Sequence, residues 1–192
     1  MRLSFAMLVV FLVSALASGC KSESASDAPA ERGALTALTE PANALSEELM
    51  LCLGQAKNFH HKADVLMSDG KLDEAADEVA TIMAIPFPKD APESEDALLD
   101  TRARLATLRI AQQRLDEAMT LVDDGIASAT RKSFFLANVH TVRGEIFEAK
   151  AATAEDGSVA DSSAKIEAIK AFDTSIEINR SLLQVLKTKA KP

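Results

Sequence analysis

One ten-residue pattern occurs twice in this chain, and it constrains the fold more than any other feature. The run GKLDEAADEV at 70–79 returns as QRLDEAMTLV at 113–122, and EAIKAF at 167–172 is a shorter third copy. In each copy apolar side chains lie three or four residues apart, which is the spacing of one face of an α-helix. Each copy also follows another helical stretch, so each is predicted to be the second helix of a helical hairpin.

Prolines and glycines mark where the first helices are expected to begin and end. The first helix is predicted to open at 39–41, where proline suits a first turn, and to end before Gly70. Three prolines within 85–92 end the second helix, because proline cannot continue one. Asp90 and Glu93 fit a capping box at the start of the third helix.

Amphipathic stripes supply the expected core of six helices. A fifth helix is predicted over about 134–152, a sixth after a polar loop at 153–163, and a short capping helix around 182–186. The apolar residues expected to face the core are Leu45, Leu49, Leu53, Ala56, Ala63 and Leu66 in the first helix, Leu72, Ala75, Ala76, Val79, Ile82 and Met83 in the second, Leu98, Ala103, Leu105, Ala106 and Ile110 in the third, Leu115, Ala118, Val122 and Ile126 in the fourth, and Ile166, Ile169, Phe172 and Ile176 in the sixth. No strand-like alternation of useful length occurs, so the predicted fold class is all-α, with antiparallel helical hairpins.

Small residues are expected where the two helices of each hairpin cross, because helices approach closely only where small side chains meet. The pairs are Ala63 with Ala75, Ala106 with Ala118, and Gly144 with Ala168. The first two pairs have the same separation of twelve residues.

The first nineteen residues have the composition of a secretory signal. Arg2 is followed by a mostly apolar run over 3–17, which is shorter than the roughly 20 residues that a membrane-spanning helix needs. The run leads into ASGC at 17–20, which resembles the bacterial lipobox, although an alanine stands where that family usually has leucine. The resemblance implies that 1–19 is removed and that Cys20 carries a covalent lipid, whose two or more acyl chains anchor the protein stably in a membrane. A plain signal peptide, cut a few residues earlier, is the alternative.

The segment that follows the cysteine is expected to be a flexible tether. Residues 20–38 are rich in Ser, Ala, Glu and Asp, a composition that cannot bury a core. An aspartate directly after the cysteine would resemble an inner-membrane retention signal. Lys21 stands at that position instead, which favours the outer membrane. The expected location is therefore the cell envelope, lipid-anchored and facing the periplasm, with the folded domain over 39–192.

The helical part of the chain resembles the tetratricopeptide repeat family. The run 168–179 is the best match to that family's second helix, and the run 70–75 matches its turn. The copies are 43 residues apart from Ala75 to Ala118 and 50 apart from Ala118 to Ala168, whereas the family period is about 34. Arg109 also stands where a large apolar residue is usual. A short solenoid of three hairpins is expected, and an irregular helix bundle with the same small-residue contacts is the alternative.

The resemblance also implies a concave face, lined by the first helix of each hairpin, that takes a peptide or another protein. The residues at the family's groove positions are Lys57, His60, Asp64 and Met67 in the first hairpin, Asp100, Thr107 and Ile110 in the second, and Asn138, Thr141, Glu145 and Glu148 in the third. The clamp that some relatives use for a C-terminal carboxylate is missing. Simple exposure to solvent is the alternative for each residue.

Composition and motifs exclude several other functions. The net charge of −8 opposes binding to nucleic acid, whose phosphates would be repelled. Cys52 is the only thiol after Cys20, so no internal disulfide is expected in a chain that begins there, and its apolar neighbours predict a buried, inert side chain. The adjacent His60 and His61 point about 100° apart on a helix and cannot chelate one ion together. No nucleophile–base pair, metal-ligand spacing or phosphate loop is recognisable, so neither an enzyme, a metal site nor a cofactor other than the lipid is expected.

Two functions remain for the folded part. The first is a lipid-anchored interaction scaffold that serves cell-envelope assembly, a pilus or a secretion system by binding an unidentified protein or peptide. The second is a helical bundle that binds a small ligand, a metal or haem in the periplasm.

Overall fold

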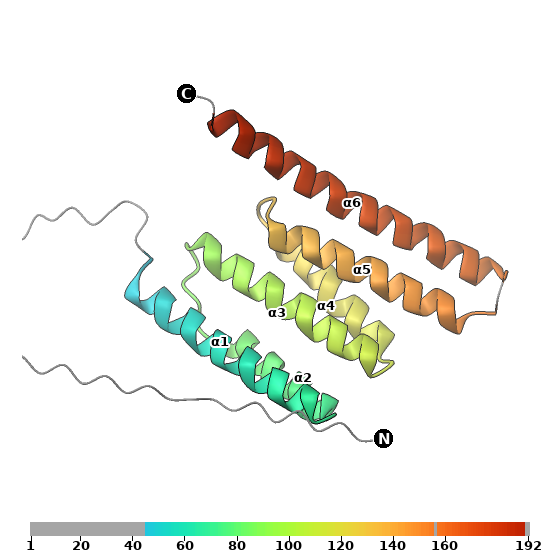
Figure 1. Cartoon of the computed structure of the whole chain (residues 1–192), viewed down its shortest axis with the longest axis horizontal. Coiled ribbons are helices and arrows are strands. Elements are labelled where there is room, and N and C mark those ends of the chain that lie inside the picture. Colours follow the sequence, from blue (N-terminus) through green and yellow to red (C-terminus); the bar gives the residue numbers. More distant parts are fainter. Residues whose placement is uncertain (1–44, 156, 191–192) are drawn as a thin grey trace, which may run out of the picture. The chain divides into compact units, whose positions relative to one another are not determined.

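The computed structural model describes residues 45–155 and 157–190, which form helices joined by turns and short loops, with no strand among them. Figure 1 shows the helices in chain order. They are α1 (Glu47–Ser68), α2 (Leu72–Thr81), the short 3-10 helix η1 (Ile82–Ala84), α3 (Pro92–Ala111), α4 (Leu115–Ser128), α5 (Phe134–Thr153) and α6 (Val159–Lys189). The prediction of an all-α fold is confirmed for this part of the chain. The predicted signal 1–19 and tether 20–38 lie outside the described residues, as do residues 39–41. The first helix was expected to run from there through Leu45, but α1 begins at Glu47 and Leu45 is exposed.

The helices pack as three consecutive hairpins, α1 with α2, α3 with α4, and α5 with α6. Each first helix also contacts the first helix of the next hairpin, so α3 lies against both α1 and α5. The second helices fill the other side, with α2 against α3 and α4 against α5. Among the described helices, α6 packs against α5 alone. The hairpin order in the chain is therefore also the packing order.

The first two hairpins are joined by the same type of turn. After α1, the Lys71 N–H donates to the Leu66 carbonyl at 2.9 Å, and after α3 the Arg114 N–H donates to the Arg109 carbonyl at 2.8 Å. This bond closes a Schellman motif, whose preceding residue adopts a left-handed conformation. Gly70 holds that position in the first turn with φ 75°, and Gln113 holds it in the second with φ 61°. The repeated sequence therefore gives a repeated backbone, even where glycine is replaced.

The core consists of three clusters of buried side chains that follow the hairpins. The largest joins the second hairpin to α5 through Leu99, Ala103, Ala106, Ala118, Val122, Val139, Val142 and Ile146. A second joins the first hairpin to α3 through Ala63, Ala75, Ala76, Val79, Leu105 and Leu108. A third, around Cys52, Ala56, Ile82 and Ile85, holds the segment after α2 against the start of α1. Because α3 contributes to the two larger clusters, it is the element that unites the fold.

The small residues predicted at the helix crossings are all buried. Ala63, Ala75, Ala106 and Ala118 have no exposed surface, and Ala168 has 3%. Gly144 is also buried, and a Cβ built on it would lie 2.5 Å from Cε1 of Phe172 in α6. The contact at the third crossing is thus made by a glycine and the edge of an aromatic ring. The expected burial of Cys52 is confirmed as well, since the residue is 8% exposed, and its thiol forms no disulfide within the described part of the chain.

Four local predictions are corrected by the structure. Ala91, and not Asp90, is the N-cap of α3, and it makes no side-chain capping bond. Ser46, Ser133 and Ser158 accept the capping hydrogen bonds of α1, α5 and α6 instead. In α3 it is Leu99, not Leu98, that is fully buried, and α6 runs unbroken over the region expected to form a separate capping helix. Most of the apolar stripe predicted to be the core face of α6 is exposed, with Ile166 at 53%, Ile169 at 60% and Ile176 at 52%.

Candidate functional site

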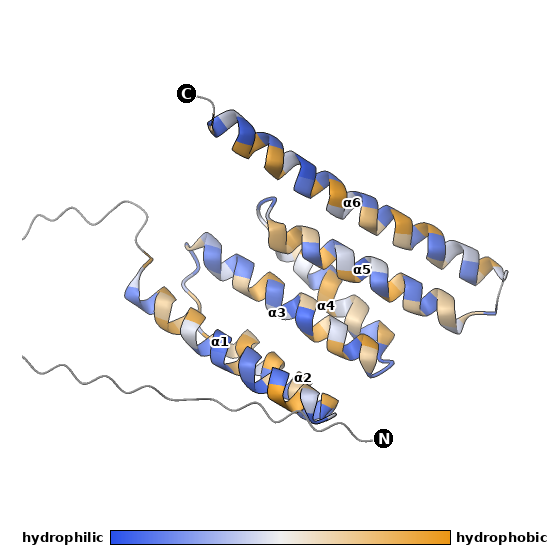
Figure 2. Cartoon of the chain, in the orientation of Figure 1, coloured by the Kyte–Doolittle hydropathy of each residue, from blue (hydrophilic) through white to orange (hydrophobic). Residues whose placement is uncertain are grey.

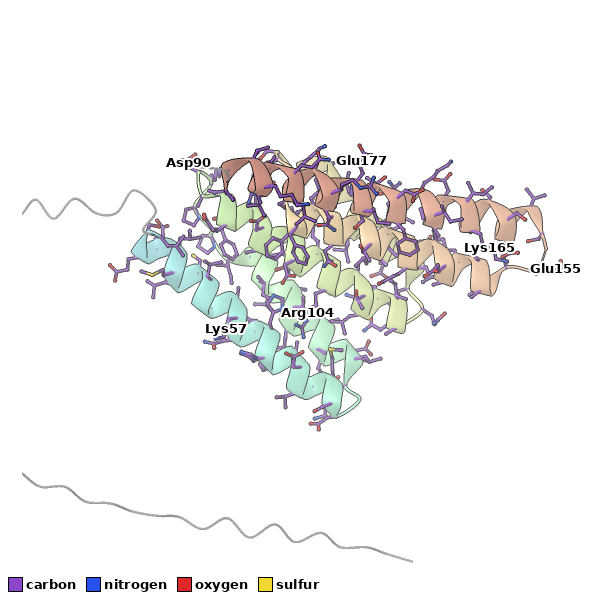
Figure 3. The ribbon with its side chains drawn as sticks, turned by 45° about the horizontal axis from the view of Figure 1, so that its top comes forward. Lys57, Asp90, Arg104, Glu155, Lys165 and Glu177 are labelled. Atoms are coloured by element: carbon purple, nitrogen blue, oxygen red, sulfur yellow. The ribbon has the colours of Figure 1, made fainter. Side chains whose placement is uncertain are left out.

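A groove of about 480 Å³ lies between α1 and α3, with the start of α5 at one end. Its apolar surface comes from Leu53 and Ala56 in α1, Ala97 in α3 and Phe135 in α5. The first helix of each hairpin (α1, α3 and α5) therefore contributes to one concave site, on the side of the hairpins opposite α2 and α4. In Figure 3, Lys57 is labelled on α1 and Arg104 on α3, the two helices that line the groove.

Charged side chains surround the apolar floor of this groove. They are Lys57, His60, His61 and Asp64 from α1, and Glu93, Asp96, Asp100 and Arg104 from α3. They come from successive turns of both helices, because residues three and four apart share one helix face. The groove thus combines an apolar floor with a rim in which four carboxylates accompany two strong bases, Lys57 and Arg104.

Two of the rim carboxylates are already neutralised within the protein. Arg104 forms an ion pair with Asp64 across the groove, from α3 to α1. Arg131, in the turn before α5, forms one with Asp96. The other oxygen of Asp96, Oδ1, is buried without a hydrogen-bond partner among the described atoms. Glu93 has no ion-pair partner in the described part of the chain, so its carboxylate remains an acceptor for a donor from outside.

His60 lines the groove from α1 and lies close to Asp100 of α3. Its Nε2 lies 3.7 Å from Oδ2 of Asp100, and its Nδ1 is buried without a hydrogen-bond partner. Burial lowers the pKa of His60 below its ordinary value of 6.5, and the nearby Arg104 lowers it further. The carboxylate of Asp100 acts in the opposite direction but does not overcome the loss of hydration. At neutral pH the side chain is therefore an uncharged imidazole with one unused nitrogen.

The structure brings together four of the eleven residues that the family resemblance placed in a groove: Lys57, His60, Asp64 and Asp100. The other seven lie elsewhere. Met67 and Thr107 are exposed further along their helices, and Asn138 is half-buried on α5. Ile110 packs against the largest core cluster, and the Thr141 hydroxyl shares a 2.9 Å hydrogen bond with that of Ser175 in α6. Glu148 lines a separate hollow between the end of α5 and the start of α6, and burial together with Glu148 raises the pKa of Glu145.

The remaining eight residues that line the groove were not predicted from the sequence. Leu53 lies one turn before Lys57, Ala56 lies one turn before His60, and Asp96 and Ala97 lie one turn before Asp100. Their spacing of three or four residues from the predicted positions was the available signal. Phe135 had no such signal, because its contribution depends on how α5 begins beside α3.

No cluster of three or more His, Cys, Asp or Glu side chains that could hold a metal ion occurs within residues 45–155 and 157–190. In the same ranges no helix is long and apolar enough to cross a membrane.

The class of protein that these features define is an all-helical protein of consecutive helical hairpins with an apolar groove. No protein family, curated protein or solved structure matches this chain.

Proposed function

We propose that this protein is a lipid-anchored interaction scaffold of the bacterial periplasm, which binds a segment of a partner protein in the groove between α1 and α3. The single observation that carries the proposal is the groove itself, which has an apolar floor and an acidic rim where Glu93 has no ion-pair partner among the described residues. Binding sites of this kind are concave and mostly apolar, with a few polar groups that fix orientation. The lipobox-like run ending at Cys20 supports the anchor and the periplasmic location.

The proposal includes a tetratricopeptide-like stacking of the three hairpins. Contacts of α1 with α3 and of α3 with α5 support it, because in such solenoids the first helices line one concave face. The burial of Ala63, Ala106 and Gly144 supports it too, since these residues let the paired helices approach. An irregular helix bundle has the same small-residue contacts, so the groove, and not the repeat family, carries the functional argument.

The chemistry of the groove favours a segment with an apolar anchor and a neighbouring hydrogen-bond donor or cation. Leu53, Ala56 and Phe135 offer an apolar surface to the anchor. The carboxylate of Glu93 can accept from the donor. Such a contact is strengthened by the partial exclusion of water, because charge-assisted hydrogen bonds gain in a less polar environment. The proposed envelope machinery, whether an assembly, pilus or secretion system, would supply the partner.

Photo-crosslinking in intact cells tests the proposal. A photoreactive side chain at position 57, on the groove, should capture one discrete protein. The same side chain at Ala127, exposed on α4 away from the groove, is the control and should not capture it. Equal capture from both positions, or none from position 57, would contradict a partner in the groove.

A small apolar ligand is the second candidate, and the volume of the groove favours it. A space of about 480 Å³ lies within the range of about 300–1,000 Å³ that is typical of small-molecule sites. Native mass spectrometry of the purified protein distinguishes the two candidates. A retained molecule that is lost on filling the groove at Ala97 would support the ligand, and a bare chain that still binds a partner protein would support the scaffold.

A further inference from the structure

The outer face of α6 carries a row of apolar side chains with no helix against it in the described part of the chain. Ile169, Ile176 and Leu183 are 60%, 52% and 57% exposed. They are spaced by seven residues, which is close to two helical turns, so they lie in one line along the helix. Figure 2 shows hydrophobic residues recurring along α6, and α6 packs only against α5.

This row is distinct from the face that α6 turns to α5. Ala168, Ala171 and Ser175 are buried, and each row residue follows a buried or half-buried one, so the row lies about 100° further around the helix. Glu177, labelled in Figure 3 on α6, follows Ile176 directly in the sequence and is exposed. Apolar groups aligned along an exposed helix in this way are typical of an interaction surface, whereas single exposed ones are ordinary.

Two opposite charges interrupt the row, one on each side of Ile176 and at nearly equal distances from it. Asp173 lies three residues before Ile176, and Arg180 lies four residues after it. The order along the stripe is therefore apolar, acidic, apolar, basic, apolar, with Ile176 at its centre. Neither charge has an ion-pair partner among residues 45–155 and 157–190.

A stripe of this order is complementary to itself when it is reversed. If a second α6 lies antiparallel with its Ile176 opposite the first, then Ile169 faces Leu183 and Asp173 faces Arg180. A two-fold axis repeats each contact, so two apolar pairs and two ion pairs form around the central isoleucines. Isologous interfaces of this kind are the commonest in homo-oligomers. A parallel arrangement would instead place Asp173 against Asp173 and Arg180 against Arg180.

We propose that two copies of this chain pair through this face of α6, antiparallel and related by a two-fold axis at Ile176. The partner that covers the apolar row is thus a second copy of the protein. The ion pairs set the register and the antiparallel direction, while the apolar row supplies the buried area. The groove between α1 and α3 is formed by other helices, so pairing through α6 leaves it open in each copy.

Co-purification of two differently tagged copies of the full chain, from detergent extracts of cells that express both, tests this pairing. Wild-type copies should co-purify. Asp173→Arg leaves basic residues at both 173 and 180, and Arg180→Asp leaves acidic residues at both. When both tagged copies carry the same variant, the amount that co-purifies should therefore fall at least tenfold. A mixture of the two variants should recover the wild-type level, because every basic residue then faces an acidic one.

The control is Asp77→Arg, the same charge change at an exposed position on α2, which should leave co-purification unchanged. Failure of the wild-type copies to co-purify would overturn the proposal. That result is also the one expected if another segment of the same chain, and not a second copy, covered the row. Self-pairing of either variant at the wild-type level, or a mixture that pairs no better than its components, would overturn it equally.

Discussion

Gln113 holds a backbone conformation that side chains rarely adopt, at the position where the first hairpin uses Gly70. The φ angles of 61° and 75° belong to the left-handed region, which glycine enters without the steric penalty that a Cβ brings. The same Schellman hydrogen bond closes both turns, so the two positions are equivalent. The second hairpin therefore tolerates a strained residue that the first avoids.

Replacing Gln113 by Gly should raise the free energy of unfolding by about 1 kcal/mol, because the strain of the left-handed conformation is relieved. The reciprocal change Gly70→Gln should lower it by a similar amount, since nothing lies within 4 Å of a Cβ there and only the backbone conformation is affected. Urea unfolding of both variants measures these changes. A destabilised Gln113→Gly variant would show that the glutamine side chain contributes more than its conformation costs.

His60 should make the stability of the protein depend on pH below neutrality. Its pKa in the folded protein is lowered from 6.5, first by burial and then by Arg104. As pH falls below 6.5, the unfolded chain takes up a proton that the folded chain resists, so the free energy of unfolding falls until the lower, folded pKa is reached. His60→Asn should therefore flatten the loss of stability between about pH 7 and pH 5.

The matched control is His61→Asn, the exposed neighbour on the same helix, which should leave the slope close to that of the wild type. Urea unfolding at a series of pH values provides the measurement. His140, whose pKa burial also lowers, accounts for a remaining slope in the His60 variant. A slope that is unchanged by His60→Asn would contradict the loss of hydration described for this side chain.

The α5–α6 pair depends on a close approach that only a glycine permits. A Cβ on Gly144 would meet three atoms of the Phe172 ring at 2.5–2.8 Å, whereas a Cβ on Gly54 in α1 would meet nothing within 4 Å. Both glycines lie inside helices, where alanine is otherwise preferred. The two positions therefore separate the effect of packing from that of helix propensity.

Gly144→Ala should destabilise the protein by about 1–3 kcal/mol, because the ring and α6 must move to admit the methyl group. Gly54→Ala should stabilise it by about 0.5–1 kcal/mol, through helix propensity alone. In thermal unfolding, the melting temperature should fall for Gly144→Ala and rise for Gly54→Ala. The double variant Gly144→Ala with Phe172→Leu should recover part of the loss; a Gly144→Ala chain as stable as the wild type would mean that the helices are less tightly paired.

The sequence predicted the helices and their crossings because both depend on local spacing. Ala63, Ala106 and Gly144 could be identified from the repeats alone, and all three are buried. The outer side of α6 was misjudged for a reason that no local pattern reveals: Ile169 and Ile176 have the periodicity of a core stripe, but no further helix among the described residues covers them. The groove was predicted only in part, since Lys57 and Asp100 follow helix spacing while Phe135 depends on the packing of α5.

The whole protein combines two expected functions, anchoring at one end of the chain and binding in the helical part. The lipobox-like run around Cys20 is the only feature of the sequence that predicts attachment to a membrane, and it lies outside the described residues. Within those residues no helix could replace it as a span. Attachment and binding should therefore be separable by substitution.

Cys20→Ser should release the protein from the membrane fraction, because the thiol that would carry the lipid is lost. Lys21→Ala, a change at the next residue that keeps the thiol, is the control and should leave the protein membrane-bound. Fractionation of cell extracts measures the distribution. Retention of the Cys20→Ser protein in the membrane fraction would contradict a lipid anchor at that residue.

Filling the groove tests the proposed binding site most directly. Ala97 lies on its apolar surface, so Ala97→Trp should occupy the space that the partner's anchor requires, while Ala127→Trp adds the same side chain to the exposed side of α4. With both variants folded as judged by their helical content, the groove-filled protein should lose at least tenfold of the partner captured by the wild type, and the α4 variant should lose none. Full capture by the Ala97→Trp protein would show that the partner binds elsewhere.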